Sequence, residues 1–168
     1  VKLISEKDFS IEPKKRKHNS YKYHYGLGYF IGGSKSMPGA INMSVLAALR
    51  SGQGIARVYQ ENPIPRHLEV IYGHIHDQID FSKPDSIVFG PGLIGNDNIY
   101  QEIYDTINGS TIKTVIDGGG LKYVDLDNIK NPNMIITPHE KEFSDLFSVG
   151  VDDVEHHPFD YIKQVVKK

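Results

Sequence analysis

Four short segments of this sequence combine glycine with polar residues in a way that suits ligand binding. Each follows a short apolar run: Gly32-Gly33-Ser34, Gly90-Pro91-Gly92, Asp117-Gly118-Gly119-Gly120 and Thr137-Pro138-His139-Glu140. Glycine lets a backbone approach a ligand closely, and N–H groups at a helix start attract anions. Because such donors outnumber the acidic groups in these segments, the pattern predicts a phosphorylated ligand. Gly33, Ser34, Gly39 and Gly90 are the candidate anion-binding residues.

Three polar side chains belong to the same segments. His139 and Glu140 precede an expected helix, where they could contact a ligand or cap the helix. Asp117 ends an expected strand, and its carboxylate could hold the adjoining glycine loop by accepting backbone N–H bonds. A catalytic or magnesium-binding role is the second interpretation of Asp117.

Familiar phosphate and metal signatures fail on spacing. Ser34 interrupts the Gly-Lys-Ser order that a Walker A loop requires. A dinucleotide fingerprint beginning at Gly26 would place its third glycine at Ile31, inside a strand. The pair His74-x-His76 lacks further ligands at a suitable spacing, so we expect a loop with exposed histidines and predict no metal site.

Apolar runs and helical patterns alternate along the chain and must position these segments. We expect strands at residues 29–31, 55–59, 68–72, 86–89, 111–116 and 133–136, and helices at 40–50, from a cap at Asn96 to 107, through 143–147 and at 158–166. This alternation predicts an α/β fold with a largely parallel sheet covered by helices. Parallel strands end at one edge, so the four segments should meet there and form a binding crevice.

Composition excludes several classes of protein. The chain has 168 residues and no cysteine, which excludes disulfide scaffolds, thiolate metal sites and cysteine catalysis and favours a cytoplasmic location. Nineteen basic and twenty-one acidic residues give a net charge of −2, which argues against a broad nucleic-acid-binding face. No apolar run approaches the roughly 20 residues of a membrane span.

Residues 1–20 are expected to form a surface arm. The arm contains the basic run Lys14-Lys15-Arg16-Lys17-His18, which is either a solvated charged segment or a lip that attracts phosphate to a site. The opening residues are polar and mixed in charge, so they do not have the pattern of a secretory signal.

Five blocks in this order resemble the ribokinase-like NAD(P)H-hydrate dehydratases that depend on ADP or ATP. The blocks lie within about residues 21–147: Gly33-Ser34-Lys35-Ser36-Met37-Pro38-Gly39-Ala40, Ala47-Ala48-Leu49-Arg50-Ser51-Gly52-Gln53-Gly54, Val88-Phe89-Gly90-Pro91-Gly92-Leu93, Ile116-Asp117-Gly118-Gly119-Gly120-Leu121 and Ile135-Ile136-Thr137-Pro138-His139-Glu140-Lys141-Glu142-Phe143. The resemblance implies a three-layer, mostly parallel, doubly wound sheet of the ribokinase-like type.

The resemblance also implies an activity and a set of contacts. A hydroxyl on the hydrated nicotinamide ring would be phosphorylated by ADP or ATP, with Mg²⁺ as a compatible cofactor, and then eliminated to leave NADH or NADPH. By position, Ala40, Gly92 and His139 would contact the hydrated dinucleotide, and Glu140 lies beside them.

The resemblance stops before the family's catalytic segment. The family continues into a later half with a Gly-Thr/Ser-Gly-Asp segment, and this sequence contains no Gly-x-Gly-Asp. The resemblance therefore implies that the catalytic aspartate lies beyond Lys168, and it assigns no catalytic residue within this chain.

Residues 1–168 accordingly look like one partial, truncated domain. The uncovered sheet of such a domain predicts self-association into a homo-oligomer. Two alternatives to the dehydratase stay open: a small-molecule kinase of the same fold, and a non-catalytic module that binds a dinucleotide or a protein.

Overall fold

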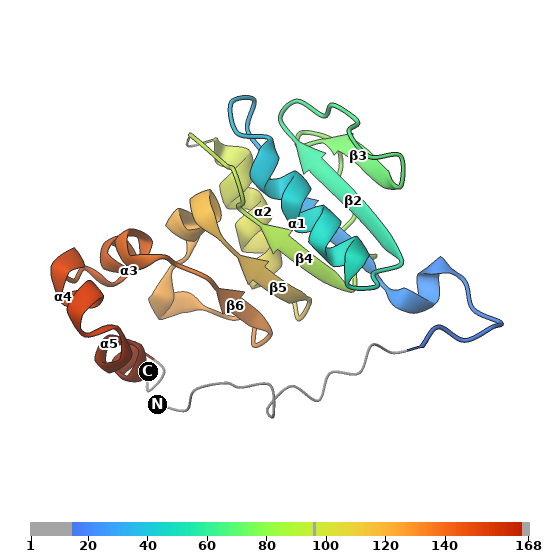
Figure 1. Ribbon diagram of the computed structural model, residues 1–168. Coiled ribbons are helices and arrows are strands. Elements are labelled where there is room, and N and C mark those ends of the chain that lie inside the picture. Colours follow the sequence, from blue (N-terminus) through green and yellow to red (C-terminus); the bar gives the residue numbers. More distant parts are fainter. Residues whose placement is uncertain (1–14, 96, 166–168) are drawn as a thin grey trace.

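A six-stranded parallel sheet forms the centre of the protein (Figure 1). The computed structural model describes residues 15–95 and 97–165. The strands are β1 (Leu27–Ile31), β2 (Ile55–Gln60), β3 (Val70–His74), β4 (Ser86–Phe89), β5 (Lys113–Ile116) and β6 (Met134–Ile136). Their order across the sheet is β3-β2-β1-β4-β5-β6, and all five pairings are parallel, which confirms the predicted fold class.

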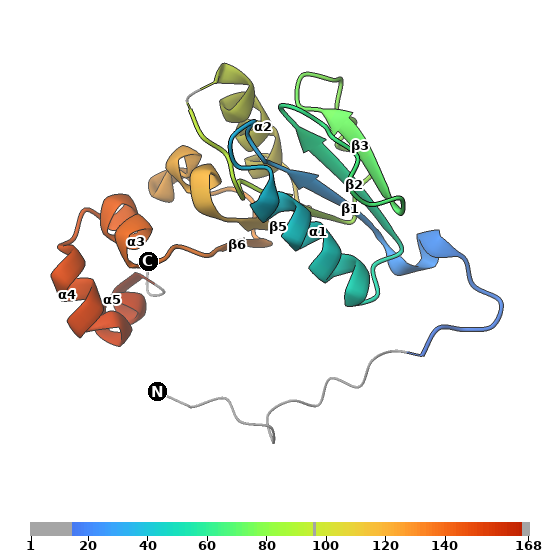
Figure 2. The same ribbon diagram turned by 45° about the horizontal axis from the view of Figure 1, so that its top comes forward.

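Helices lie on both faces of this sheet. They are α1 (Gly39–Arg50), α2 (Asn98–Asn108), α3 (Glu140–Phe147), α4 (Val151–His156) and α5 (Pro158–Val165), with short 3-10 turns η2 (Lys22–Tyr25), η3 (Gly118–Tyr123) and η4 (Leu126–Asn128). In Figure 1, α1 lies in front of the sheet and α2 behind it, while α3, α4 and α5 gather beyond β6. Figure 2 shows the same grouping from another side. The sequence pattern did not predict α4.

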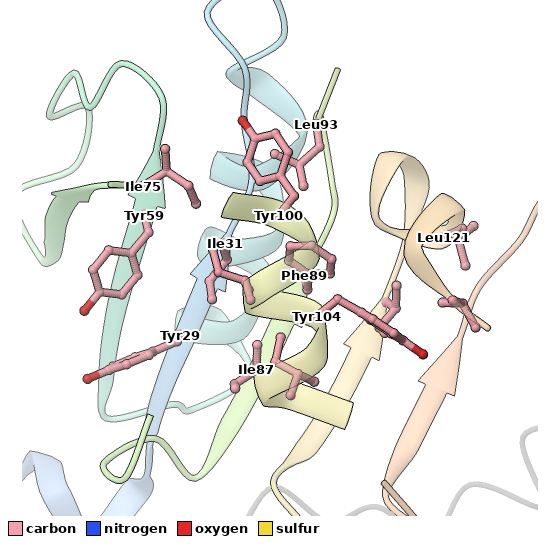
Figure 3. Packing of buried hydrophobic residues seen from close by; sticks show 14 residues of the cluster. Tyr29, Ile31, Tyr59, Ile75, Ile87, Phe89, Leu93, Tyr100, Tyr104 and Leu121 are labelled. Carbon is pink, nitrogen blue, oxygen red and sulfur yellow. The ribbon is translucent and has the colours of Figure 1, made fainter. Parts of the chain in front are cut away.

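Alternating side chains of the strands divide the core between the two faces. Tyr29 and Ile31 of β1 lie on the same side of the sheet as α2 and join a large buried cluster, which Figure 3 shows. Phe30, between them, belongs to the second cluster with Ile41 and Val45 of α1. Because successive strand residues face opposite sides, the continuous apolar run of β1 supplies both layers.

Several element boundaries differ from the sequence expectation by one or two residues, and two of these differences concern a turn and a helix cap. β3 begins at Val70 rather than at residue 68, because Leu68 is fully exposed and lies in a turn. Asp97 is the N-cap of α2, and its carboxylate accepts a hydrogen bond from the Ile99 N–H at 3.1 Å. Asn96, the expected cap, lies outside the described residues.

One sheet face is covered by α1 only in part. Contacts of α1 concentrate on β1 and β2, and Figure 1 shows no helix in front of β5 and β6. A cavity of 590 Å³ opens on this side, with a wall that includes Ala48, Val88, Val115 and Ile135. Ile135 of β6 is 61% exposed, so an apolar side chain stands at the sheet edge.

The described part of the basic run lies at the edge opposite the four glycine segments. The Arg16 guanidinium stacks over the Tyr25 ring at 4.5 Å and donates to the Gly52 carbonyl oxygen at 3.2 Å. Tyr25 and Gly52 precede β1 and β2, so both lie at the amino ends of strands. The interpretation of this run as a lip over the site is therefore wrong for residues 15–18; Lys14 and the start of the arm lie outside the described residues.

Within the described ranges, no helix combines the length and the apolar character that a membrane crossing requires.

Candidate functional site

The strand order changes direction between β1 and β4, and the loops after these two strands meet there. The chain runs from β1 outward to β3, and later from β4 outward to β6. The Gly33 N–H donates to the Pro91 carbonyl at 2.9 Å, and the Ser34 N–H donates to the Gly92 carbonyl at 2.8 Å. In open parallel sheets, ligands bind in the crevice at such a switch point. The predicted meeting of these two segments is confirmed.

Two glycines make this close approach possible. A Cβ on Gly92 would stand 2.3 Å from the Met37 carbonyl oxygen, and Gly92 has a φ of +72°. A Cβ on Gly90, at a φ of +114°, would stand 2.0 Å from the Asp117 carbonyl oxygen. Neither position has room for a side chain, so these glycines bring three loops into contact.

The ends of β5 and β6 join the same edge through one side-chain bond. The Thr137 hydroxyl donates to the Asp117 carboxylate at 2.7 Å, and the Thr137 N–H donates to the Ile116 carbonyl at 3.1 Å. Asp117 makes no side-chain bond to the N–H groups of η3, which it precedes. The predicted support of the glycine loop by this carboxylate is therefore wrong: the Asp117 backbone carbonyl holds Gly120, and the carboxylate holds β6.

His139 is the N-cap of α3. Its Nδ1 accepts from the Lys141 N–H at 3.2 Å and the Glu142 N–H at 3.5 Å, and the Glu142 carboxylate accepts from the His139 N–H at 3.0 Å. Because Nδ1 accepts, the neutral ring carries its proton on Nε2. That atom lies 3.5 Å from Glu142 Oε1, and the His139 side chain is 61% exposed. Capping is confirmed, and ligand contact by Nε2–H stays a prediction. Glu140 is exposed in the first turn of α3.

Three of the predicted anion-binding N–H groups are already paired. Those of Gly33 and Ser34 bond to the β4 loop, and that of Gly90 donates to the Ile31 carbonyl at 2.9 Å. These residues thus hold the crevice together. No side chain of the described chain caps α1, which begins after Pro38 at Gly39. The first turn of α1, with Gly39 exposed and Ala40 half-buried, is a place where N–H groups can face an anion.

Glu61, immediately after β2, is a rim residue that the sequence reasoning missed. Its carboxylate accepts from the Lys35 N–H at 3.1 Å and from the Tyr100 hydroxyl at 2.5 Å. Burial, and then the bond to Glu61, raise the pKa of Tyr100, which keeps this phenol a neutral donor. A cavity of 480 Å³ lies beside the crevice and is lined by Glu61, Ile94, Gly95, Asp97, Asn98 and Tyr100. The one available signal was an acidic residue directly after a buried strand.

The histidine motif forms no metal centre among the described residues. His74 ends β3, its ring stacks on that of His76 at 5.3 Å, and the Asp77 carboxylate accepts from the His74 N–H at 2.8 Å. Within residues 15–95 and 97–165, no three His, Cys, Asp or Glu side chains are placed to hold one ion.

The fold and the switch-point crevice define an α/β protein of the ribokinase-like class. A solved ribokinase-like protein from Enterococcus faecalis has a TM-score of 0.67 at 25% identity and matches 82% of this chain and 54% of its own. A Bacillus subtilis ADP/ATP-dependent NAD(P)H-hydrate dehydratase, co-crystallised with ATP and Mg²⁺, has a TM-score of 0.75 at 27% identity. The match covers 89% of this chain and 57% of the Bacillus subtilis chain.

Sequence comparison gives the family. The family model described as NAD(P)H-hydrate dehydratase matches residues 29–168, and the chain belongs to this family. It is 25% identical to the ADP-dependent enzyme of Streptococcus pneumoniae over 82% of this chain and 52% of that protein. It is 32% identical to the ATP-dependent enzyme of Caenorhabditis elegans over 74% of this chain and 46% of that protein. The chain thus spans about half the length of these relatives.

The family match reaches Lys168, but the description of the structure ends earlier. Lys168 and the two residues before it lie outside the described residues, so the helix expected at 158–166 is described only as α5, Pro158–Val165. The expected place of the catalytic aspartate, beyond Lys168, lies outside them too and stays a prediction. The described residues therefore show which loops meet at the carboxyl ends of the strands, and they assign no catalytic residue.

Proposed function

We propose that this chain carries the dinucleotide-binding part of an NAD(P)H-hydrate dehydratase that uses ADP or ATP. The observation that carries the proposal is the meeting of the loops after β1 and β4, which are hydrogen-bonded to each other beside the uncapped first turn of α1. The helix start suits a pyrophosphate or phosphate group. A substrate of this size and charge agrees with the family of the chain.

The reaction would proceed in two steps. The ring hydroxyl of hydrated NADH or NADPH attacks the terminal phosphoryl group of ADP or ATP, which releases AMP or ADP and the hydroxyl proton. The C–O bond then breaks with loss of phosphate and of a ring proton, which restores NADH or NADPH. Phosphate is a far better leaving group than hydroxide, which explains why a dehydration needs a phosphoryl donor.

The chain's own residues would bind and orient the dinucleotide. Ala40 would offer its N–H from the first turn of α1, and Gly92 would let the backbone approach the ligand. His139 would donate from Nε2, because Nδ1 is engaged as a cap. Glu140 follows His139 and is exposed at the start of α3, within reach of the same ligand in this proposal. Gly33 and Gly90 would act through the loop geometry that they permit.

Magnesium is assigned no step here. The relative from Bacillus subtilis was co-crystallised with ATP and Mg²⁺. Mg²⁺ usually binds substrate phosphates and one or two carboxylates. Asp117 is one carboxylate at this edge of the sheet, and it accepts a hydrogen bond from Thr137. The described residues contain no cluster of three ligands, so they do not form a magnesium site of their own.

A second copy of the chain is proposed as the partner of the uncovered sheet face. The support is the 590 Å³ cavity over β4, β5 and β6 and the exposed apolar edge at Ile135. Burying this surface would remove apolar area from water and pair the free edge of β6. A cytoplasmic location is proposed from the cysteine-free composition alone.

A second candidate function is a non-catalytic module that binds the dinucleotide. It rests on the same loops after β1 and β4, whose contacts fix a binding geometry and involve no catalytic group. A ribokinase-like small-molecule kinase is the third interpretation of this fold. The module and the enzyme share the crevice and differ in turnover.

The test is to incubate the chain with hydrated NADH, Mg²⁺ and ADP or ATP and to follow recovery of NADH absorbance. Recovery that depends on the nucleotide supports the enzyme. No recovery, together with calorimetric binding of NADPH, supports the binding module. If the chain shows neither NADH recovery nor NADPH binding, both functions are refuted.

A further inference from the structure

Glu61 joins three segments at the rim of the crevice. It follows the last residue of β2, its Oε2 accepts from the Lys35 N–H at 3.1 Å, and its Oε1 accepts from the Tyr100 hydroxyl at 2.5 Å. Lys35 belongs to the loop between β1 and α1, and Tyr100 to the first turns of α2. The Glu61 carboxylate thus connects the loop between β1 and α1 to α2, which lies on the opposite face of the sheet from α1.

The two partners of Glu61 differ in how firmly they are held. Tyr100 is 1% exposed, and its ring packs in the large core cluster, so its hydroxyl has a fixed position (Figure 3). Lys35 is exposed and lies at a bend in the loop between β1 and α1. The bond from Tyr100 therefore orients the carboxylate, and the carboxylate restrains the loop.

This loop leads directly into the proposed anion-binding turn. Gly33 and Ser34 are fixed to the β4 loop by their N–H groups, and Pro38 precedes Gly39 at the start of α1. Between these fixed points, the loop backbone at Lys35 is held by Glu61. A shift there would change the distance between the α1 turn and Gly92.

We propose that Glu61 is a positioning residue for dinucleotide binding, with Tyr100 as its anchor. This inference takes its ligand from the proposed function. The hydrogen bonds by which Glu61 restrains the loop do not depend on that function. Glu61 orders the backbone that presents the first turn of α1 and is not itself a ligand of the dinucleotide. Its two hydrogen bonds carry this role, and its negative charge does not.

A conservative variant, Glu61→Gln, keeps both hydrogen bonds and removes the negative charge. In Glu61→Gln, the amide oxygen accepts from the Lys35 N–H, and the amide nitrogen donates to the Tyr100 oxygen, which is also an acceptor. Glu61→Ala removes both bonds, and Tyr100→Phe removes the anchoring bond alone. Tyr104→Phe is the matched control, because Tyr104 is a second buried tyrosine of α2. Its hydroxyl lies near the Asp125 backbone but has no partner at hydrogen-bonding geometry among the described residues.

The first measurement is hydrogen exchange at the Lys35 amide, read by NMR without any ligand. Loss of a hydrogen bond to a charged acceptor should accelerate exchange by about tenfold in Glu61→Ala, with a smaller acceleration in Tyr100→Phe. Glu61→Gln and Tyr104→Phe should exchange as the unaltered chain does. An unchanged Lys35 rate in Glu61→Ala would overturn the proposal.

The second measurement is calorimetric affinity for NADPH in the same variants. We expect about tenfold weaker binding for Glu61→Ala, with affinity regained in Glu61→Gln and unchanged in Tyr104→Phe. Faster Lys35 exchange with unchanged NADPH affinity would assign Glu61 a merely structural role and overturn the proposal. If the unaltered chain binds no NADPH, the proposed function fails, and the Lys35 exchange rates alone decide whether Glu61 holds the loop.

Discussion

Gly92 and Met37 come so close that a Cβ on the glycine would stand 2.3 Å from the Met37 carbonyl oxygen. Met37 lies just before α1, and Gly92 lies in the loop after β4. Replacing Gly92 with alanine should force these loops apart and abolish NADPH binding. Gly52→Ala is the control, because Gly52 also has a positive φ, +105°, but nothing within 4 Å of a new Cβ.

The two glycine variants separate strain from site geometry. Both should lose about 1–2 kcal/mol of stability from the unfavourable φ of alanine, measured by urea unfolding. Gly92→Ala should lose more, and it alone should lose NADPH affinity by calorimetry. Equal NADPH affinity in a folded Gly92→Ala would remove Gly92 from the site.

His139 combines a cap with an exposed Nε2–H that lies beside Glu142, and two substitutions divide these roles. His139→Ala should lower the free energy of unfolding by about 1 kcal/mol, because the first turn of α3 loses its cap. His139→Asn keeps a capping oxygen and should stay near the stability of the unaltered chain. Both should weaken NADPH binding, since neither presents the imidazole Nε2–H. Full affinity in His139→Asn would assign His139 to capping alone.

Tyr100 should make stability fall at high pH. Its pKa is raised above the ordinary value of 10.0, first by burial and then by the bond to Glu61. The folded state therefore favours the neutral phenol: the contribution is complete below about pH 10 and is lost as the pH rises above it. Burial likewise raises the pKa of Tyr29 to about 12, so several tyrosines share this loss.

The contribution of Tyr100 is isolated by substitution. Between about pH 9 and pH 11, the free energy of unfolding, measured with urea, should fall less steeply with pH for Tyr100→Phe than for the unaltered chain. Parallel declines would mean that the Tyr100 phenol does not titrate differently in the two states.

Self-association should depend on the edge at β6. Ile135 is 61% exposed there, and Ile71 is 43% exposed on β3 at the other edge of the sheet. A charged side chain on an edge strand opposes pairing. Light scattering at tens of micromolar, roughly where weak interfaces fill, should show a dimer that Ile135→Lys dissociates and Ile71→Lys preserves. A monomer in the unaltered chain would refute association at this concentration.

Local patterns predicted the fold well because the strands are continuous apolar runs. β4 was predicted with its observed bounds, Ser86–Phe89, since a polar residue precedes it and Gly90 follows it. The start of β3 was less certain, because Leu68 is apolar yet exposed. The short helix α4 was missed, since Val154 is its only buried residue and gives no periodic signal.

The candidate site was predictable only in part. Parallel strands bring their carboxyl ends together, so the sharing of one edge by the loops of Gly33 and Gly92 followed from strand positions. Their direct contact depends on β1 and β4 being neighbours, which the sequence did not predict. The partners of individual N–H groups could not be predicted from the sequence, because they depend on how two loops pack. Glu61 could not be recognised, since its role requires Lys35 and Tyr100, which are distant in sequence and adjacent only after folding.

The most direct test of the account is a hydrogen-exchange footprint of NADPH on the unaltered chain, read by mass spectrometry. If the three segments share one dinucleotide site, residues 34–40, 90–95 and 138–140 gain protection together, with one common dependence on NADPH concentration. Residues 15–25, at the opposite edge of the sheet, should exchange as they do without ligand. Protection of one segment alone, or protection centred on residues 15–25, would contradict a shared dinucleotide crevice at the strand ends.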